Sequence, residues 1–511
     1  MRQSWRCRRC GLNVRQERDQ IVSLLTALGF AQSSLLNASS MSSLVSRNIA
    51  NSTVTGASLK SANTIWSPNG DVTLGGVQRS TDAALSQRLL NANSDAAAQS
   101  AVSSALDTLN QTVGDPNNNA SPAGLISQLS TSLQTLAASP SDLTTAQAAV
   151  AAARNLSDAL NGATKTVQTA RATADSTIAN DVDSLNKSLG KFETLNAAIV
   201  SGTLSGTDVT DQLDERDQLI SSMSKLIGIT VTTGANNNVS LFTDSGVTLF
   251  QGTPRTVTFT PTSTFAPGVT GNAVYIDNTP VTGPNSPMPI QSGEIAGATQ
   301  ARDSSAVVYQ SQLDEMARSL ITSFAESSVS ANPATAAGLF TYPGAPALPA
   351  LGQPGLAGSI SVASSADPTK GGNAFLLRDG GIAGVAYSAN TTGAAGFTGN
   401  IQNMIDALSS SQAFAPAAGL ASTATLADYS AASAGWLGAE RQTATNNVNY
   451  QNTIVQTTSQ ALSNKTGINI DNQMMTMLNV EQSYQASAKL LTTIDTMYSS
   501  LFAVINPTLA A

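Results

Sequence analysis

The sequence predicts a mainly α-helical protein with β insertions, in which helices from the two ends of the chain pair as a coiled coil. Apolar residues recur with a heptad spacing near both termini, which is typical of helices that pack lengthwise against a partner. The stretch from 141 to about 201 contains no proline and predicts one long helix. Segments rich in Thr, Val, Gly and Pro lie between the helical regions, so we expect a long helical rod domain with small inserted β domains.

The terminal seams are the first elements to justify. A mean spacing of 3.5 residues keeps one stripe of a helix facing its partner along the whole length. The residues that we assign to these assembly seams are Leu24, Leu28, Leu35, Val45, Ile49, Met477, Val480, Tyr484, Leu491, Ile494, Tyr498, Leu501 and Ile505, with Ala31, Ala38, Ser42 and Ser487 between them. We expect the two ends to pair with each other, with neighbouring copies, or with both. The alternative is two ordinary amphipathic helices packed on a globular core.

The elements between the seams follow from caps and breaks. Gly56 and Pro68-Asn69-Gly70 mark an extended stretch, and Thr81-Asp82 caps a helix that stops at Gly114-Asp115-Pro116. Ser141-Asp142 caps the longest helix. Further helices are expected over 125–136, 208–227, 294–329, from 401 onwards and over 428–463. Strand-like runs occupy 239–242, 256–260, 273–276, 359–363 and 374–377.

These elements divide the chain into regions that are nested in sequence. The predicted regions are a non-native leader, 1–21; a terminal coiled-coil and assembly domain, 22–80 and 465–511; a helical rod domain, 81–228, 293–331 and 401–464; an inserted β domain, 229–292; and a Gly/Pro-rich β-like insertion, 332–400. The terminal and rod domains each combine distant segments, so the chain leaves and returns along one rod.

The first 21 residues differ in character from the rest. They are rich in arginine and contain both cysteines, Cys7 and Cys10. A lone CxxC without a second pair or a histidine cannot complete a tetrahedral zinc site. We interpret 1–21 as an upstream translation artefact, with Val22 encoded by an alternative start codon. A cleaved secretory signal is the alternative, and N-terminal sequencing of the native protein decides between the two.

Composition and charge exclude several function classes. The formal net charge of −8 argues against a nucleic-acid partner, since neutralising phosphates needs clustered Lys and Arg. The chain contains no histidine, which removes the commonest general base and metal ligand. We therefore expect no enzymatic activity, no catalytic residue, no cofactor and no metal. No apolar run approaches the ~20 residues of a membrane span, so we expect no membrane insertion.

The densest acidic cluster contains Asp211, Asp214, Glu215 and Asp217. On a helix the first three share one face, so a calcium site or an acid/base site is one interpretation. A solvated helix face is the other, and we favour it because charge runs on helices usually face water.

Particular motifs resemble the bacterial flagellar axial proteins. Asn48-Ile49-Ala50-Asn51 followed by Gly56 is similar to the N-terminal signature of rod, hook and hook-associated proteins. Leu-Asp-Glu-Arg-Asp-Gln-Leu at 213–219 resembles a stretch of the hook-associated protein 1 family. So do Gly-Glu-Ile-Ala-Gly at 293–297 and the segments 467–471 and 484–489. The similarity covers about 22–505 and is thin over 230–290 and 332–425.

The resemblance implies a structural component of the bacterial flagellum that forms the junction between hook and filament. It implies export by the flagellar type III system and an extracellular location in the flagellum. The implied partners are further copies of the chain in a ring, the hook protein, hook-associated protein 3 and an export chaperone.

Three other interpretations stay open at this point. One is a sibling axial protein, hook-associated protein 3 or flagellin. Another is a secreted coiled-coil adhesin, which requires the leader to be a real signal. An enzyme inserted at 332–425 is the third, and the lack of histidine or of a convergent acidic cluster there disfavours it.

Overall fold

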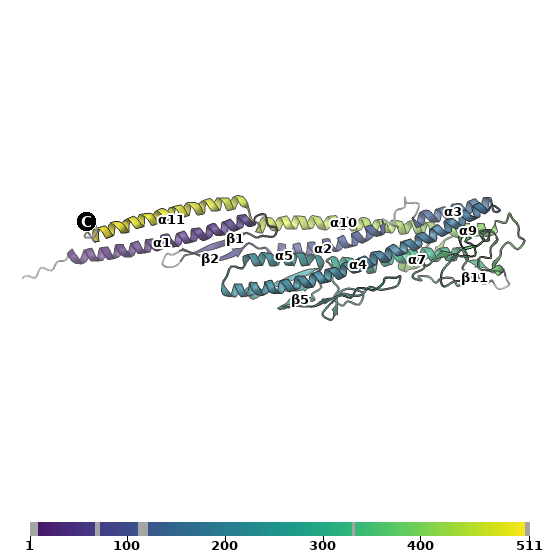
Figure 1. The fold of residues 1–511 in the computed structure, drawn as a ribbon, viewed down its shortest axis with the longest axis horizontal. Coiled ribbons are helices and arrows are strands. Elements are labelled where there is room, and N and C mark those ends of the chain that lie inside the picture. Colours follow the sequence, from purple (N-terminus) through teal and green to yellow (C-terminus); the bar gives the residue numbers. More distant parts are fainter. Residues whose placement is uncertain (1–8, 67–71, 111–120, 330–332, 506–511) are drawn as a thin grey trace, which may run out of the picture.

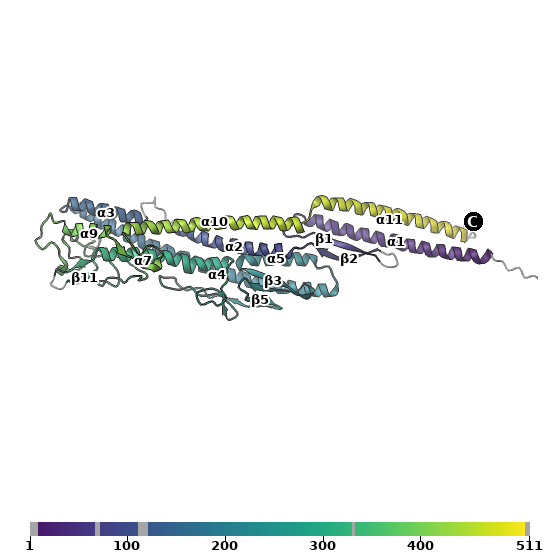
Figure 2. The same cartoon turned by 180° about the vertical axis from the view of Figure 1, so that it is seen from behind.

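The protein is elongated, with a pair of terminal helices at one end and a helical rod at the other (Figure 1). The computed structural model describes residues 9–66, 72–110, 121–329 and 333–505, and within them the side chains of 24–65, 73–110, 121–329 and 333–503. The terminal helices, α1 (Arg9–Asn51) and α11 (Ile470–Ile505), lie side by side in both views (Figure 2). A hairpin of β1 (Lys60–Trp66) and β2 (Val72–Arg79) packs beside α1.

The rod consists of helices that run along its length. In chain order they are α2 (Ala83–Leu109), α3 (Pro122–Ala138), α4 (Leu143–Ser205), α5 (Thr210–Leu226), α6 (Glu294–Gln300), α7 (Ala306–Ser323), α8 (Leu376–Asp379), α9 (Gly399–Ser409) and α10 (Leu426–Thr466). A π-helical turn, Ala301–Ser305, joins α6 to α7. The chain leaves the terminal pair along α2 and returns to it along α10 (Figure 1).

The longest helix, α4, has 63 residues and therefore spans ~95 Å. It begins where the Asp142 carboxylate accepts a hydrogen bond from the Thr144 N–H (2.8 Å), as the sequence predicts. It ends at Gly206, whose φ of 71° is the left-handed conformation that glycine adopts without steric cost.

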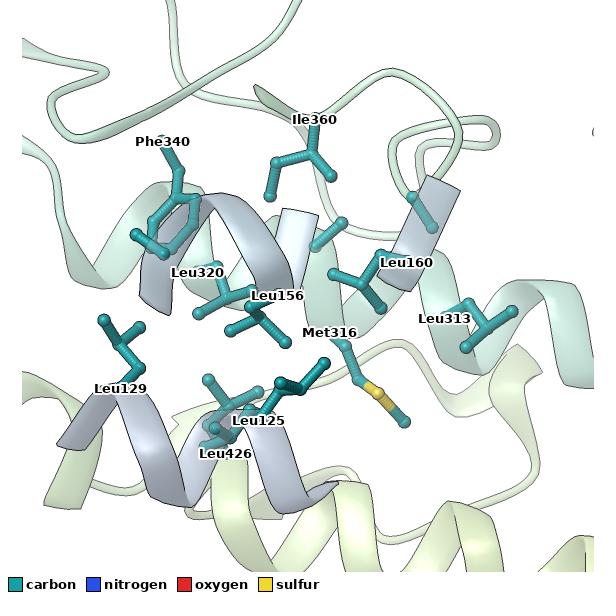
Figure 3. Packing of buried hydrophobic residues seen from close by; sticks show 14 of the residues in the cluster. Leu125, Leu129, Leu156, Leu160, Leu313, Met316, Leu320, Phe340, Ile360 and Leu426 are labelled. Carbon is teal, nitrogen blue, oxygen red and sulfur yellow. The ribbon is translucent and has the colours of Figure 1, made fainter. Parts of the chain in front are cut away.

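The half of the rod farther from the terminal pair has a dense apolar core. Figure 3 shows side chains of α3, α4, α7 and α10 and of the insertion after α7 converging there. Its labelled members are Leu125, Leu129, Leu156, Leu160, Leu313, Met316, Leu320, Phe340, Ile360 and Leu426. Burying each such side chain contributes about 1.5–3 kcal/mol, so this region supplies its own folding free energy.

The predicted inserted β domain forms two small antiparallel sheets against α4. One sheet has the order β3-β4-β5-β6, with β3 (Ile229–Thr233), β4 (Val239–Thr243), β5 (Thr248–Gln251) and β6 (Thr253–Pro254). The other contains β7 (Val257–Thr258), β8 (Tyr275–Ile276) and β9 (Thr279–Pro280). Phe250 of β5 packs edge-on against Phe192 of α4 with ring centroids 4.8 Å apart. The sheets therefore share a core with the rod.

Short antiparallel strand pairs lie within the second insertion and on either side of it. They are β10 (Glu326–Ser327) with β11 (Thr335–Ala336), β12 (Phe340–Thr341) with β13 (Ser361–Val362), and β14 (Gln412–Ala413) with β15 (Thr423–Ala424). The predicted strand at 374–377 is wrong, because these residues lead into α8. The Asn373 side chain accepts a hydrogen bond from the Phe375 N–H (3.0 Å) and its carbonyl accepts one from Leu376 (3.1 Å), which starts a helical turn.

Threonine hydroxyls on the exposed face of α4 bond back to their own helix. Thr169, Thr173 and Thr177 donate to the carbonyls four residues earlier at 2.9–3.2 Å. Thr492 and Thr496 of α11 do the same. These hydroxyl donors are therefore already used within each helix.

The mainly α fold with β insertions and paired terminal helices is confirmed. The helix α1 begins at Arg9, so it runs through the predicted leader boundary at Val22. Several residues used in the sequence analysis lie outside the described residues. They are 1–8 of the predicted leader, which include Cys7, and the turns Pro68-Asn69-Gly70 and Gly114-Asp115-Pro116. Within the described part of the chain, no helix is long and apolar enough to cross a membrane.

Candidate functional site

The candidate site is the terminal helix pair together with its joint to the rod. Side-chain pairs that cross the seam include Ser34 with Ser487 (2.9 Å), Ser42 with Met477 (3.6 Å) and Asn48 with Gln473 (2.9 Å). Residue numbers rise along α1 while they fall along α11, so the helices are antiparallel. The heptad spacing keeps the two stripes in contact over this length.

Most predicted seam residues lie between the two helices. Val45 and Ile494 are buried, as are the small residues Ala31, Ala38 and Ser487. Half-buried positions are Leu24, Leu28, Leu35, Ile49, Met477, Val480, Leu491, Tyr498 and Leu501. Tyr484 is 45% exposed, so the helix pair does not enclose this predicted seam residue. The side chain of Ile505 lies outside the described residues.

The helix pair also exposes apolar side chains on its outer side. We call this set the outer face; its members on α11 are Ile470, Met474, Met475, Leu478, Leu490, Met497 and Phe502, and on α1 Leu25 and Leu36. Leu36 is 68% exposed and Phe502 is 64% exposed. Exposed apolar patches of this kind mark interaction sites on soluble proteins. The pair therefore has one side buried by its own chain and another that is not.

Asn48 ties three segments together where the terminal pair meets the rod. Its amide nitrogen donates to the Lys60 carbonyl (2.8 Å) and to Gln473 (2.9 Å), and its amide oxygen accepts from the Lys60 N–H (3.2 Å). The side chain is almost fully buried, and it links α1, β1 and α11. This gives a physical role to the first residue of the Asn-Ile-Ala-Asn motif.

Charged residues form an ionic ladder across the same joint. The acidic side consists of Asp208, Asp211, Asp214 and Asp217, spaced three residues apart beside and along α5. The basic side is Arg47 of α1, Lys60 of β1 and Arg79 of β2. Their pairs are Arg47–Asp208 (2.8 Å), Arg47–Asp211 (3.6 Å), Lys60–Asp211 (2.7 Å), Lys60–Asp214 (2.9 Å), Arg79–Asp214 (3.0 Å) and Arg79–Asp217 (2.7 Å).

Asp214 is the centre of the ladder. It is 5% exposed and accepts hydrogen bonds from the Ser58 N–H (3.1 Å) and hydroxyl (2.6 Å) as well as from Lys60 and Arg79. Burial by itself raises the pKa of Asp214, but the hydrogen bonds from Ser58, Lys60 and Arg79 outweigh it and hold the pKa below its usual value. The group is therefore a carboxylate at neutral pH, and it needs its cations because an unpaired buried charge is costly.

The ladder corrects the expectation of a solvated acidic helix face. From the sequence, Asp211, Asp214 and Glu215 were predicted to share one face of a helix. In the structure Asp211 and Asp214 instead lie together with Asp217 in the ladder, and Glu215 is exposed. Among the described residues no group of three or more acidic residues, histidines or cysteines is placed to hold a metal ion. The carboxylates instead bind cations supplied by the chain itself.

Gly56 and the 213–219 motif also meet at this joint. The Gln218 side chain donates to the Thr55 carbonyl (2.9 Å) and lies against Gly56, where a Cβ would approach its Cγ to 2.9 Å. Gly56 has a φ of 81°, which favours glycine as well. Residues 156 and 163 positions apart in sequence are thus in direct contact.

The opposite side of α5 faces the rod. Arg216 is almost fully buried and donates to the Asn196 side chain (3.1 Å) and to the Asn237 carbonyl. Burial lowers the pKa of Arg216 to about 10, so it stays charged at neutral pH. Alternate residues of one motif therefore hold α5 to the rod on one side and to the terminal domain on the other.

Sequence reasoning missed the basic half of the ladder. Lys60 is 1% exposed at its side chain, yet it stands in a polar stretch that carries no recognisable motif. The available signal was the rarity of cations, because only 25 Lys and Arg occur in 511 residues. Lys60 and Arg79 lie at the two ends of the predicted extended stretch, and their pairing with the run of aspartates could have been considered.

Comparisons with known proteins agree with these motifs. The family described as "Flagellar hook-associated protein FlgK helical domain" matches residues 106–330, and "Flagellar basal body rod FlgEFG protein C-terminal" matches 459–503. Flagellar hook-associated protein 1 of Salmonella typhimurium is 28% identical over 249 residues, which cover 46% of this chain and 44% of that protein. The corresponding protein of Escherichia coli K12 is 26% identical over 263 residues, covering 50% and 47%. The chain thus spans less than half of the length of these relatives.

A solved structure is also similar. It is titled the flagellar hook junction protein FlgK from Burkholderia pseudomallei, with 22% identity and a TM-score of 0.41 over 50% of this chain and 46% of that one.

The fold and the terminal pair define a rod-shaped structural protein with its two ends joined. The two matched segments and the curated relatives show that the chain is similar to flagellar hook-associated protein 1, one of the flagellar axial proteins. These relatives are structural flagellar proteins and not enzymes. None of the relatives named above is a hook-associated protein 3, a flagellin or an adhesin.

Proposed function

We propose that this chain forms the junction between hook and filament of a bacterial flagellum, as a ring of copies of itself. The outer face of the terminal pair is the observation that carries the proposal. Its apolar side chains are ordered on a helix that its own chain covers on one side only. Association with neighbouring subunits would remove this surface from water and supply free energy that the isolated chain lacks.

The remaining parts of the proposal follow from this similarity. Export by the flagellar type III system would deliver the chain to the extracellular flagellum. The hook protein would lie on one side of the ring and hook-associated protein 3 on the other, with an export chaperone binding the C-terminal seam beforehand. The seam residues then act in assembly, and the β insertions face outwards as spacers.

The deciding experiment replaces the outer face without touching the seam. Met474→Ser, Met475→Ser and Leu478→Ser together should leave the α1–α11 pair and the rod folded but abolish filament attachment. A second variant, Leu491→Asp with Ile494→Asp, should disrupt the pair as well as attachment. Electron microscopy of cells and circular dichroism of the purified chains read the two effects separately.

The matched control is Thr169→Asp with Thr173→Asp, which adds the same charge on exposed positions of α4 in the rod. This control should retain filaments. Normal filaments in the Met/Leu triple variant would refute the role of the outer face. Cells without the gene should carry hooks without filaments and shed flagellin into the medium; filamented cells would refute the junction role itself.

A further inference from the structure

The helix α10 is packed in two different ways along its length. In its first part Leu426, Tyr429, Ser433 and Leu437 are almost completely buried. Tyr429 stacks on Phe414 with ring centroids 3.8 Å apart, and the Ser433 hydroxyl donates to the Gln312 side chain (2.7 Å). This part belongs to the dense core of the rod.

Beyond Leu437 the burial decreases sharply. In the stretch 438–466, which is fully described, the buried residues are the small Ala444 and Thr458. The helix here lies along α2, and the contacts that join the two include exposed polar pairs, Arg441–Asp107 (2.6 Å) and Asn447–Gln99 (3.2 Å). Exposed pairs of this kind contribute little to stability.

A surface hollow of about 300 Å³ lies at the edge of the interface between these two helices. The residues that line it are Ser100, Ser103, Ser104, Asp107, Thr108 and Val448. Small polar residues form most of its wall, so few dispersion contacts hold the helices together at this level.

Two glycines lie where the packing changes. A Cβ atom added at Gly435 or at Gly438 would meet no atom within 4 Å, and neither residue has a positive φ. Gly297 shows the contrast, because a Cβ there would come within 2.2 Å of the Ala98 carbonyl oxygen. No close approach requires glycine at 435 and 438, whereas glycine inside a helix weakens it relative to alanine.

The end of α10 is tied to the joint by backbone carbonyls. The Thr466 carbonyl accepts from the Leu59 N–H (2.7 Å), and the Lys465 carbonyl accepts from the Ser80 hydroxyl (3.1 Å). A few hydrogen bonds at one end and a polar interface along the side are weaker than the core contacts of the first part of α10.

We infer that residues 439–466 form a hinged arm, which separates from α2 beyond Gly435 and Gly438 while the rod and the α1–α11 seam stay folded. The arm has its own opening equilibrium, separate from global unfolding, as regions with few buried apolar contacts do. This inference rests on packing alone and does not depend on the proposed function.

Hydrogen exchange of the purified full chain, followed by mass spectrometry, tests the arm. Peptides within 440–466 should exchange at least about a hundredfold faster than peptides within 426–434 of the same helix. Gly435→Ala with Gly438→Ala should slow exchange of 440–466 about tenfold, because alanine favours the closed helix. Equal protection on both sides of the glycines, or unchanged exchange in the double variant, would overturn the inference.

The matched control is Gly190→Ala in α4, where an added Cβ also meets no atom within 4 Å. This variant should leave exchange of 440–466 unchanged; an equal slowing there would indicate general stabilisation and overturn the hinge.

A disulfide gives a second readout. In a chain with Cys7→Ser and Cys10→Ser, Gln99→Cys with Asn447→Cys should protect the arm when oxidised and release it when reduced. Mass spectrometry confirms that the disulfide has formed. If hydrogen exchange in 440–466 is then the same in the oxidised and the reduced chain, the arm does not open from α2.

Discussion

The far half of the rod and the terminal helix pair are both helical, but they obtain stability differently. In the rod, Leu129, Leu133 and Leu156 are completely buried by side chains from several elements of the same chain. In the terminal pair, the seam is half-buried and residues such as Leu36 and Leu478 face water. The difference shows that the far half of the rod buries its apolar side chains within a single chain. The terminal pair, in contrast, leaves apolar surface exposed that a partner could cover.

The largest expected effect concerns pH and acts on the rod alone. Burial, with the neighbouring Glu294 adding to it, raises the pKa of Asp181 in α4 to about 7. The folded chain then holds a proton that the unfolded chain releases near its ordinary pKa of 3.8, so this group's contribution falls as pH rises from about 4 to about 7.

The size of this loss, by linkage, is roughly 4 kcal/mol. Denaturant unfolding at pH 4 and pH 8 should show a smaller pH-dependent loss of rod stability in Asp181→Asn than in the parent. Identical pH profiles in the two chains would show that Asp181 is not protonated in the fold.

The next effect separates the two regions by a matched pair of leucines. Leu133→Ala in α3 should lower the free energy of unfolding by about 3 kcal/mol, because it leaves a cavity in a filled core. Leu36→Ala in α1 should change it by less than about 0.5 kcal/mol, since that side chain is already in water. Equal losses measured by denaturant titration would contradict the contrast between the regions.

A smaller effect should appear at the joint. Asp214→Asn removes the charge that Lys60 and Arg79 share, and we expect a loss of about 2 kcal/mol. The local signature is faster hydrogen exchange in β1 and β2 with α4 unchanged. Asp217→Asn, where the carboxylate is about half exposed, should cost less than about 0.5 kcal/mol. If the two variants lose the same stability and show the same hydrogen exchange in β1 and β2, the ladder does not hold the terminal domain to the rod through Asp214.

Much of this architecture was readable from the sequence, for identifiable reasons. Caps such as Asp142, proline-free stretches and heptad spacing act locally, so they placed the long helices well. The strand expected at 374–377 failed because four apolar residues suit either structure, and the Asn373 side chain decided it.

The joint was not readable in the same way. The contacts of Asp214 come from residues 135–156 positions away in sequence, so the pattern on α5 alone suggested a solvated face. The half-buried state of the seams also depends on what covers the other side. Tertiary partners, rather than helical periodicity, determine both features.

The hydroxyls that bond back along α4 have a consequence for crowded surroundings. Because Thr169, Thr173 and Thr177 direct their protons at their own helix, that surface offers few free donors and few charges to neighbouring molecules. A surface of this kind has little tendency to adhere sideways to another copy of itself. The tendency to self-associate would then differ along the molecule. It would be low at this side of the rod and high at the outer face of the terminal pair.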